Sequence, residues 1–377
     1  RGSSMEHFFT VLVAGAIFCR NENLGEDQDT ESYVLRFFVL WGILSHTMRY
    51  ASRFADEDGV HKLLWAGFQF GLLLLLEGFS SSGFSSSNSS SRWSLFKVTS
   101  LSMYVFVALA FSGRIVVWLP RARPLAAFYA LVSLSAAALL LSLASSEGVH
   151  RPLLYIVAAL AVFPDACVSL ALHAFLQPGG ALQRRIGMPV NAEYLINRFE
   201  GLQLEILTVA VIVPNTVYPT RIEHTSLVVC GDVLVCVLAI ALKAALFDLA
   251  PTHGGCADEP SWATYHAIAR SERTRHLFLI AQPAVALGIA ITGGALAMLL
   301  KEVDQRGSSG ECTFAQALMC RAAAITLAAL AFVKLTHAPR WHAPCVEQPL
   351  AQWRIEQSEP PKPDAHRHAP LKQRPCP

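Results

Sequence analysis

Residues 50–64 read YASRFADEDGVHKLL and separate two long apolar segments with a short run of charges. If the first apolar segment is a helix, four polar side chains at its end share one face by their i, i+3, i+4 and i+7 spacing: His46, Arg49, Tyr50 and Arg53. The acidic residues 56–58 precede a second helix with His61 and Lys62 in its first turns, where the helix dipole favours negative charge. The stretch predicts two hydrophobic helices joined at a membrane surface. It fits both plain helix capping with a solvated loop and a functional loop.

The composition of the whole chain points to the same class of protein. Of 377 residues, 53% are hydrophobic and only 15% charged, and the mean hydropathy is +0.40. These values are too apolar for an ordinary soluble domain and predict a multi-pass membrane protein whose main partner is the lipid bilayer. The formal net charge of +2 gives no sign of a nucleic-acid partner, which needs a clustered basic surface.

About ten apolar segments are long enough to cross a hydrocarbon core of about 30 Å as helices. The sequence therefore predicts an all-α transmembrane bundle. The expected helices cover residues 5–20, 33–50, 61–79, 95–113, 125–144, 152–176, 201–219, 225–247, 276–300 and 314–335. A cleaved signal peptide is the rival interpretation of the first segment, and we rank it lower because no small-residue cleavage site follows it.

The distribution of Lys and Arg predicts the orientation of the bundle, because cytoplasmic loops carry the excess. The loops after the even-numbered helices hold twelve Lys and Arg residues, and those after the odd-numbered helices hold seven. Both chain ends are therefore expected in the cytoplasm. Asn88 begins an Asn-Ser-Ser glycosylation acceptor in a loop that this orientation places outside. We expect a glycoprotein of the plasma membrane rather than of an internal membrane.

Three further expectations concern the segments between and after the helices. Residues 1–336 form the transmembrane domain, with a flexible serine-rich outer loop at 80–92. Residues 337–377 are rich in Pro, His, Lys and Arg and are expected to be a disordered cytoplasmic tail. The nine cysteines lack metal-type spacing and the tail histidines are scattered, so neither a metal nor another cofactor is expected.

Ionisable residues inside apolar helices are costly and tend to face the bundle interior or a water-filled cavity. Glu77 and Lys243 lie near helix ends and can reach the membrane surface. Asp165 follows Pro164, which removes a backbone hydrogen bond, and Pro164, Pro214 and Gly293-Gly294 are places where a helix can break. The candidate intramembrane polar site comprises Asp165, His173, Glu205 and Asp232, with Glu205 about one turn into its helix.

Several blocks resemble the low temperature requirement A membrane proteins of bacteria and fungi. Residues 53–64 resemble that family's Arg-Phe-Asp-Thr-Asp-Asp loop with its following helix, and residues 6–13 resemble its Glu-Leu-Phe-Phe-Asp-Leu-Val-Phe start. Residues 193–198, in the segment leading into the seventh helix, are similar to its Glu-His-x-x-Glu-Arg block, and residues 266–275 to its His- and Arg-rich loop. The matching positions are Glu6, Arg53, Asp58, His61, Glu193, Arg198 and His266.

The chain departs from the family pattern at positions that carry polar groups in the family. Thr10 stands where the family has Asp, Tyr194 where it has His, and Asn197 where it has Glu. The family's later Gly-Glu pair is missing, and Gln282 replaces a second His. The resemblance implies a divergent member of a family that is linked to growth at low temperature and has no established reaction.

Two hypotheses about function remain, and an enzyme is disfavoured because no hydrolase, metalloprotease, P-loop or dinucleotide motif is present. The first is a transporter that moves an ion, a proton or a small solute along the intramembrane polar residues. The second is a membrane scaffold or stress sensor, in which buried polar groups only join helices, an ordinary role worth about 0.6 kcal/mol for each contact.

Overall fold

The computed structural model describes eleven stretches of the chain. They are residues 13–15, 27–52, 59–80, 89–118, 123–145, 191–217, 233, 236–237, 240–244, 272–306 and 314–336. Of the two compact units into which the chain divides, Arg1–His337 and Ala338–Pro377, the first contains all of them. The expected cytoplasmic tail and most of the expected helices at 5–20, 152–176 and 225–247 lie outside the described residues.

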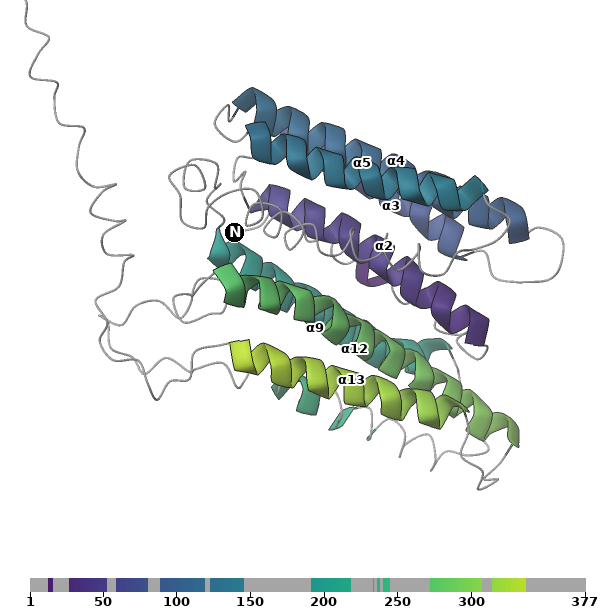
Figure 1. Ribbon diagram of the computed structural model, residues 1–377. Helices are drawn as coiled ribbons and strands as arrows, with labels where there is room; N and C mark the ends of the chain where they lie inside the picture. The colour runs from purple at the N-terminus through teal and green to yellow at the C-terminus, as the bar shows by residue number, and fades with distance from the viewer. Residues whose placement is uncertain are drawn as a thin grey trace, which may run out of the picture. The chain divides into compact units, whose positions relative to one another are not determined.

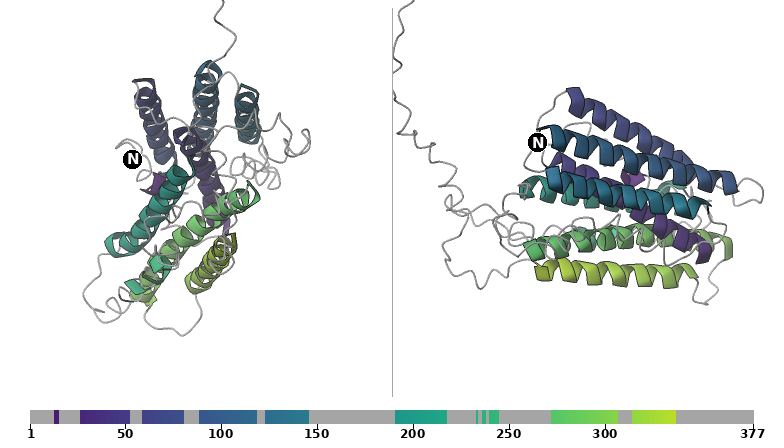
Figure 2. Two further views of the ribbon diagram at one scale, coloured as in Figure 1. Left: turned by 90° about the vertical axis from the view of Figure 1, so that its left-hand side faces the viewer. Right: turned by 45° about the horizontal axis from the view of Figure 1, so that its top comes forward.

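The described part of the chain folds into helices that lie lengthwise beside one another (Figures 1 and 2). The long helices are α2 (Asp27–Ala51), α3 (Gly59–Ser80), α4 (Ser89–Trp118), α5 (Arg123–Ser145), α9 (Ala192–Val217), α12 (Glu272–Arg306) and α13 (Phe314–Thr336). Four of them contain stretches long and apolar enough to cross a membrane: 59–76, 98–118, 274–299 and 314–336. The predicted all-α membrane bundle is confirmed.

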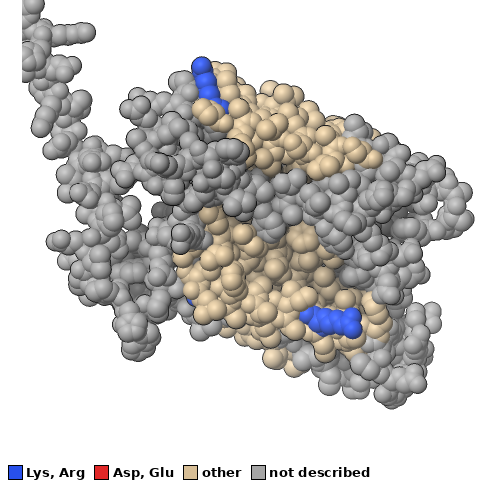
Figure 3. All heavy atoms as spheres, in the orientation of Figure 1, with Lys and Arg blue, Asp and Glu red and all other residues tan. Residues whose placement is uncertain are grey.

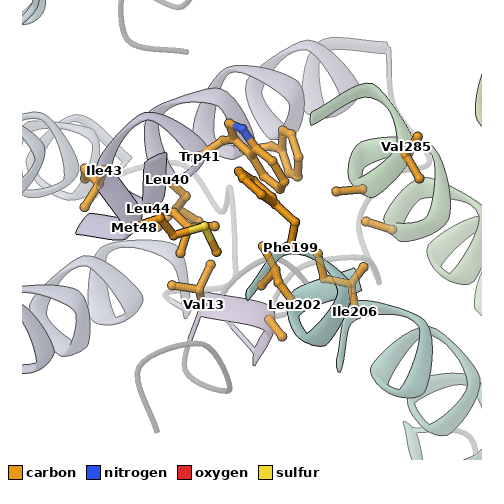
Figure 4. Packing of buried hydrophobic residues seen from close by; sticks show 14 of the residues in the cluster. Val13, Leu40, Trp41, Ile43, Leu44, Met48, Phe199, Leu202, Ile206 and Val285 are labelled. Atoms are coloured by element: carbon orange, nitrogen blue, oxygen red, sulfur yellow. The ribbon is translucent and has the colours of Figure 1, made fainter. Parts of the chain in front are cut away.

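Helix α2 lies between two groups of helices, with α3, α4 and α5 on one side and α9, α12 and α13 on the other (Figure 1). Its apolar residues are buried around the whole helix, as expected for a helix enclosed by others. Trp41 of α2 and Phe199 of α9 point toward each other (Figure 4), with ring centroids 6.2 Å apart. The core therefore forms around α2.

Small residues bring α12 close to both of its neighbours. A Cβ added at Gly293 would lie 2.8 Å from Cβ and 2.9 Å from Cα of Ala210 in α9. At Gly288 an added Cβ would lie 2.1 Å from the hydroxyl oxygen of Thr326 in α13. Small residues at such crossings are the usual means by which membrane helices approach closely.

The described helices do not break at Pro214 or at Gly293-Gly294, two places where the sequence allows a break. Helix α9 continues through Pro214, and α12 continues through Pro283 and Gly293-Gly294. Pro214 lies in the last turn of α9. Gly293 of α12 instead allows close packing against Ala210 of α9.

Helices α2, α4 and α9 begin six or more residues before the starts expected from sequence, and α2 begins at Asp27 instead of 33. Helix α9 begins at Ala192 instead of 201, because the Asn191 side-chain oxygen accepts a hydrogen bond from the Tyr194 backbone N–H at 3.0 Å, an N-cap. Helix α4 begins at Ser89, so the end of the predicted serine-rich loop 80–92 is helical. Ser80 likewise ends α3. Serine is tolerated at helix ends, so the loop predicted from composition is longer than the loop in the structure.

The outward faces of the described helices are apolar. Leu335 on α13 is 81% exposed, and Leu63 and Phe70 on α3 are also exposed. On the face seen in Figure 3, the described surface carries Lys and Arg only at isolated places, and no Asp or Glu is visible there. Faces of this kind suit contact with lipid tails rather than water.

Candidate functional site

The hydroxyl of Tyr50 joins three helices near the end of α2. Tyr50 is only 1% exposed. Its oxygen accepts a hydrogen bond from an Arg114 guanidinium N–H of α4, and it lies 3.3 Å from Nδ1 of His61 in the first turn of α3. We call Tyr50, His61, Trp65 and Arg114 the Tyr50 junction.

The position of the His61 proton follows from its two partners. The Trp65 indole N–H donates to Nε2 of His61 at 2.8 Å. An indole N–H can only donate, so Nε2 carries no proton and the proton of the neutral ring is on Nδ1. Nδ1–H then donates to the Tyr50 oxygen. The His61 and Tyr50 rings are also stacked, with centroids 5.4 Å apart and planes 19° apart.

Arg114 interacts with Tyr50 through the ring as well as the hydroxyl. Its guanidinium carbon lies 5.7 Å from the centroid of the Tyr50 ring, within the range of a cation–π contact. The side chain is 8% exposed. A charge this deeply buried requires such partners, because removal from water is costly. Arg114 therefore ties the end of α4 to the end of α2.

A second polar tier lies one helical turn from Tyr50. His46 precedes Tyr50 by four residues on α2, so both are on one helix face. Nε2 of His46 is 3.4 Å from the Ser133 hydroxyl of α5, and its ring meets Tyr104 of α4 edge-on at 6.3 Å. The Tyr104 hydroxyl donates to the Val39 carbonyl at 3.2 Å. A polar column thus follows α2 into the bundle.

The start of α9 joins the same end of α2. The Asn191 backbone N–H donates to the Ser52 carbonyl at 3.4 Å. Arg198, 7% exposed, donates through Nε to the Tyr194 hydroxyl at 3.2 Å and lies 5.3 Å from the centroid of that ring. Deeper in the bundle, the Gln203 side-chain amide donates to the Gln282 side-chain carbonyl of α12.

The structure places only some of the residues predicted from sequence. Arg198 and His61 are buried at the helix ends described above. Glu193 lies in the first turn of α9, but its side chain is not among those described. The other predicted positions lie outside the described residues: Glu6, Arg53, Asp58, Asn88, Asp165, His173, Asp232 and His266.

Glu205 requires a correction. It was expected about one turn into its helix, but α9 begins at Ala192, so Glu205 lies about three and a half turns in. The side chain is half-buried. The earlier helix start, made by the Asn191 cap, is the reason for the difference.

The burial of Arg114 also differs from the sequence-based expectation. Arg114 was counted among the cytoplasmic loop charges, as was Arg198, yet both are buried within helices. A signal was present, because Ile115, Val116 and Val117 continue the apolar run beyond Arg114. The predicted orientation therefore rests on fewer loop charges, and it remains a prediction.

The described polar side chains of the site are hydrogen-bonding groups and cations. In the stretches that the structure describes, no three His, Cys, Asp or Glu side chains gather closely enough to hold a metal ion. The polar column instead offers hydroxyl, imidazole and guanidinium groups. These groups can exchange or hold protons, or can join helices.

A family model for the bacterial low temperature requirement A protein (LtrA) matches residues 19–351 of the 377-residue chain. This range contains α2 to α13 and the whole Tyr50 junction, and it begins after the Glu6 block. No curated protein and no solved structure matches the chain. With the family match spanning nearly all of its helical bundle, the chain belongs to the low temperature requirement A family of multi-pass membrane proteins.

Proposed function

We propose that this protein moves a proton, or an ion linked to a small solute, across its membrane. The polar column along α2 carries the proposal. His46, Tyr50, His61 and Arg114 are all buried within a bundle whose outer faces are apolar. Buried ionisable groups in membrane helices are expensive, and in membrane proteins they commonly mark a pathway for ions or protons.

The transport experiment measures flux in proteoliposomes that contain a pH-sensitive dye and face an imposed proton gradient. The wild type is compared with Asp165→Asn, Asp232→Asn and His46→Gln. Lys62→Gln is the matched control, because Lys62 is exposed beside the junction. We expect flux in the wild type and the control, and reduced flux in the other three variants. Absence of flux in folded wild-type protein under every gradient would contradict transport.

A scaffold or stress sensor is the second candidate, and the continuous helices favour it. Many transporters bind their substrates at broken helices near the middle of the membrane, whereas α9 and α12 run unbroken through Pro214, Pro283 and Gly293-Gly294. In this alternative the polar column only joins helices. Wild-type protein that folds and conducts nothing would move the proposal to this class.

We also propose the plasma membrane as the site of residence, with a glycan on Asn88. The support is the Asn-Ser-Ser acceptor between α3 and α4, two helices that run through the bundle. Asn88→Gln should remove a mass shift that a glycosidase also removes. Intact glycan on the Asn88→Gln protein, or none on the wild type in a glycosylating cell, would contradict this assignment.

A further inference from the structure

Arg321 lies within the apolar helix α13, on the side that faces away from the bundle. Its Cα lies about 10 Å along the helix axis from that of Phe314, the first residue of α13. All of α13 belongs to a candidate membrane span. The buried residues of α13 form a different face of the helix, and the Arg321 side chain is exposed. The helix therefore presents a cation on a face that contacts lipid.

The residues around Arg321 on this face are apolar. Phe314 is 38% and Ile325 is 52% exposed, and Ala324 and Ala328 are exposed on the next two turns. Helix α13 contains no Asp or Glu, and the described residues offer Arg321 no hydrogen bond or ion pair. On the side of the molecule where α13 lies, Figure 3 shows basic atoms within an otherwise uncharged described surface. A guanidinium group stays charged in proteins, so this face calls for an anion beside it.

The geometry of the helix directs Arg321 toward the nearer membrane surface. In an α-helix each Cα–Cβ bond tilts toward the N-terminus, and long side chains follow that direction. Arg321 is close to the N-terminal end of α13, so the flexible stem of its side chain can carry the guanidinium group to the lipid headgroups. The anion within its reach therefore lies at the level of the headgroups rather than at the centre of the bilayer.

We propose that Arg321 binds the phosphate group of a phospholipid whose acyl chains lie along the outer face of α13. The planar guanidinium group donates two parallel hydrogen bonds to phosphate oxygens, which strengthens the contact and fixes its geometry. Ala324 and Ala328 carry only methyl groups, so an acyl chain can lie close to the helix beyond the phosphate. The proposal is independent of whether the protein transports anything.

A second copy of the chain fits this face less well than a phospholipid does. In a symmetric dimer the same surface patch of both copies meets. Contact through this face would bring two Arg321 side chains together at the same depth, and α13 has no acidic residue to neutralise them. A phospholipid instead supplies one negative phosphate for each Arg321.

Photo-crosslinking tests the proposal at the site itself. The purified protein is placed in bilayers that contain phosphatidylglycerol with a photoreactive diazirine in its headgroup, and labelled peptides are mapped by mass spectrometry. We expect Arg321→Gln to reduce labelling of α13 about threefold to tenfold. Arg321→Lys keeps the charge but loses the paired hydrogen bonds, so its labelling should be intermediate. The matched control Lys62→Gln removes an exposed charge from α3 and should leave labelling of α13 unchanged.

Two further arms identify the group that Arg321 binds. A diacylglycerol glycolipid with the same photoreactive group has no phosphate, so its labelling of α13 should not depend on residue 321. Phospholipid labelling that is equal in wild type and Arg321→Gln, or glycolipid labelling that falls equally in the variant, would overturn the proposal. Phospholipid labelling that falls as the protein-to-lipid ratio rises, with protein cross-links between two α13 helices, would overturn it in favour of a second copy.

Thermal unfolding gives a second readout that needs no cross-linking. A ligand that binds only the folded protein raises the stability of that protein as the ligand concentration increases. In neutral detergent, added phosphatidylglycerol should raise the unfolding midpoint of the wild type more than that of Arg321→Gln. Added diacylglycerol, which has no phosphate, should shift both midpoints equally. Equal shifts of the two folded proteins with phosphatidylglycerol would contradict phosphate binding at Arg321.

Discussion

At the scale of single residues, the Tyr50 oxygen is the point where α2, α3 and α4 meet. Two donors, Arg114 N–H and His61 Nδ1–H, share this one acceptor. Buried donors that lose their acceptor are costly, because no water replaces it. Two polar groups of this junction, from α3 and α4, therefore share one phenol hydroxyl.

Replacing Tyr50 with Phe tests this dependence. Tyr50→Phe keeps the ring and its stacking but leaves both donors without their shared acceptor, so unfolding should become easier by about 1–3 kcal/mol. The measurement is reversible unfolding in mixed micelles at pH 8. Thr208→Val is the control, because the Thr208 side chain is exposed. Its hydroxyl donates a hydrogen bond to the Leu204 carbonyl of the same helix. Equal stability of Tyr50→Phe and wild type would show that the hydroxyl contributes nothing.

The buried amide pair of Gln203 and Gln282 gives a second residue-scale prediction. Leucine at either position alone leaves the other amide buried without its partner, so each single variant should lose about 1–3 kcal/mol of unfolding free energy. Leucine at both positions removes both polar groups and should restore most of the loss. Unfolding of the four proteins measures the effect. A double variant that loses the sum of the two single losses would contradict the pairing.

At the scale of elements, α12 is fixed by close contact with α9 on one side and α13 on the other. Gly293 faces the Ala210 backbone and Gly288 faces Thr326. The space at each crossing leaves no room for a side chain. Helix α12 is also the most enclosed of the candidate spans, because 72% of its apolar stretch 274–299 is buried.

One added methyl group should distinguish the crossing glycine from other helical glycines. Gly293→Ala pushes α12 away from α9, since backbone atoms of Ala210 lie in the way, and should destabilise the fold by about 1–3 kcal/mol. Gly201→Ala in α9 meets nothing within 4 Å. That control should be neutral or stabilising by up to about 1 kcal/mol, because alanine favours helix. Thermal unfolding in detergent compares them, and equal effects would refute the close crossing.

At the scale of the whole molecule, apolar outer faces surround an apolar core that contains a column of polar residues along α2, as expected for a bundle that lies in lipid. Residues at the α2, α3 and α4 ends, including the Tyr50 junction, are expected on the cytoplasmic side. This placement follows from the Lys and Arg bias after removal of the buried Arg114 and Arg198 from the loop charges.

Reporter fusions test the orientation of the bundle. A reporter fused after Pro377 should be active only in the cytoplasm. One inserted between α12 and α13, near residue 310, should be active only outside. The two sites are separated by one helix, so they serve as mutual controls. Signal from the Pro377 fusion on the outer side would require an odd number of spans and would reject the predicted orientation.

The sequence by itself determined the class and most of the helices of this protein. Apolar runs of membrane-spanning length predict helices without any tertiary contact, because the backbone must satisfy its own hydrogen bonds in lipid. The start of α3 near His61 was likewise visible in the pattern of charges. The family followed from short blocks around these same helix ends.

Only the tertiary structure decided which polar residues meet. In the sequence, Arg114 looks like a charged residue of a loop. Its burial against Tyr50 depends on how α4 packs on α2. Helix periodicity places His46 and Tyr50 on one face of α2 but cannot say that Ser133, Tyr104 and His61 lie opposite. Contacts between distant segments arise when whole helices pack together. A single sequence shows which residues share a helix face, but it does not show which other helix packs against that face.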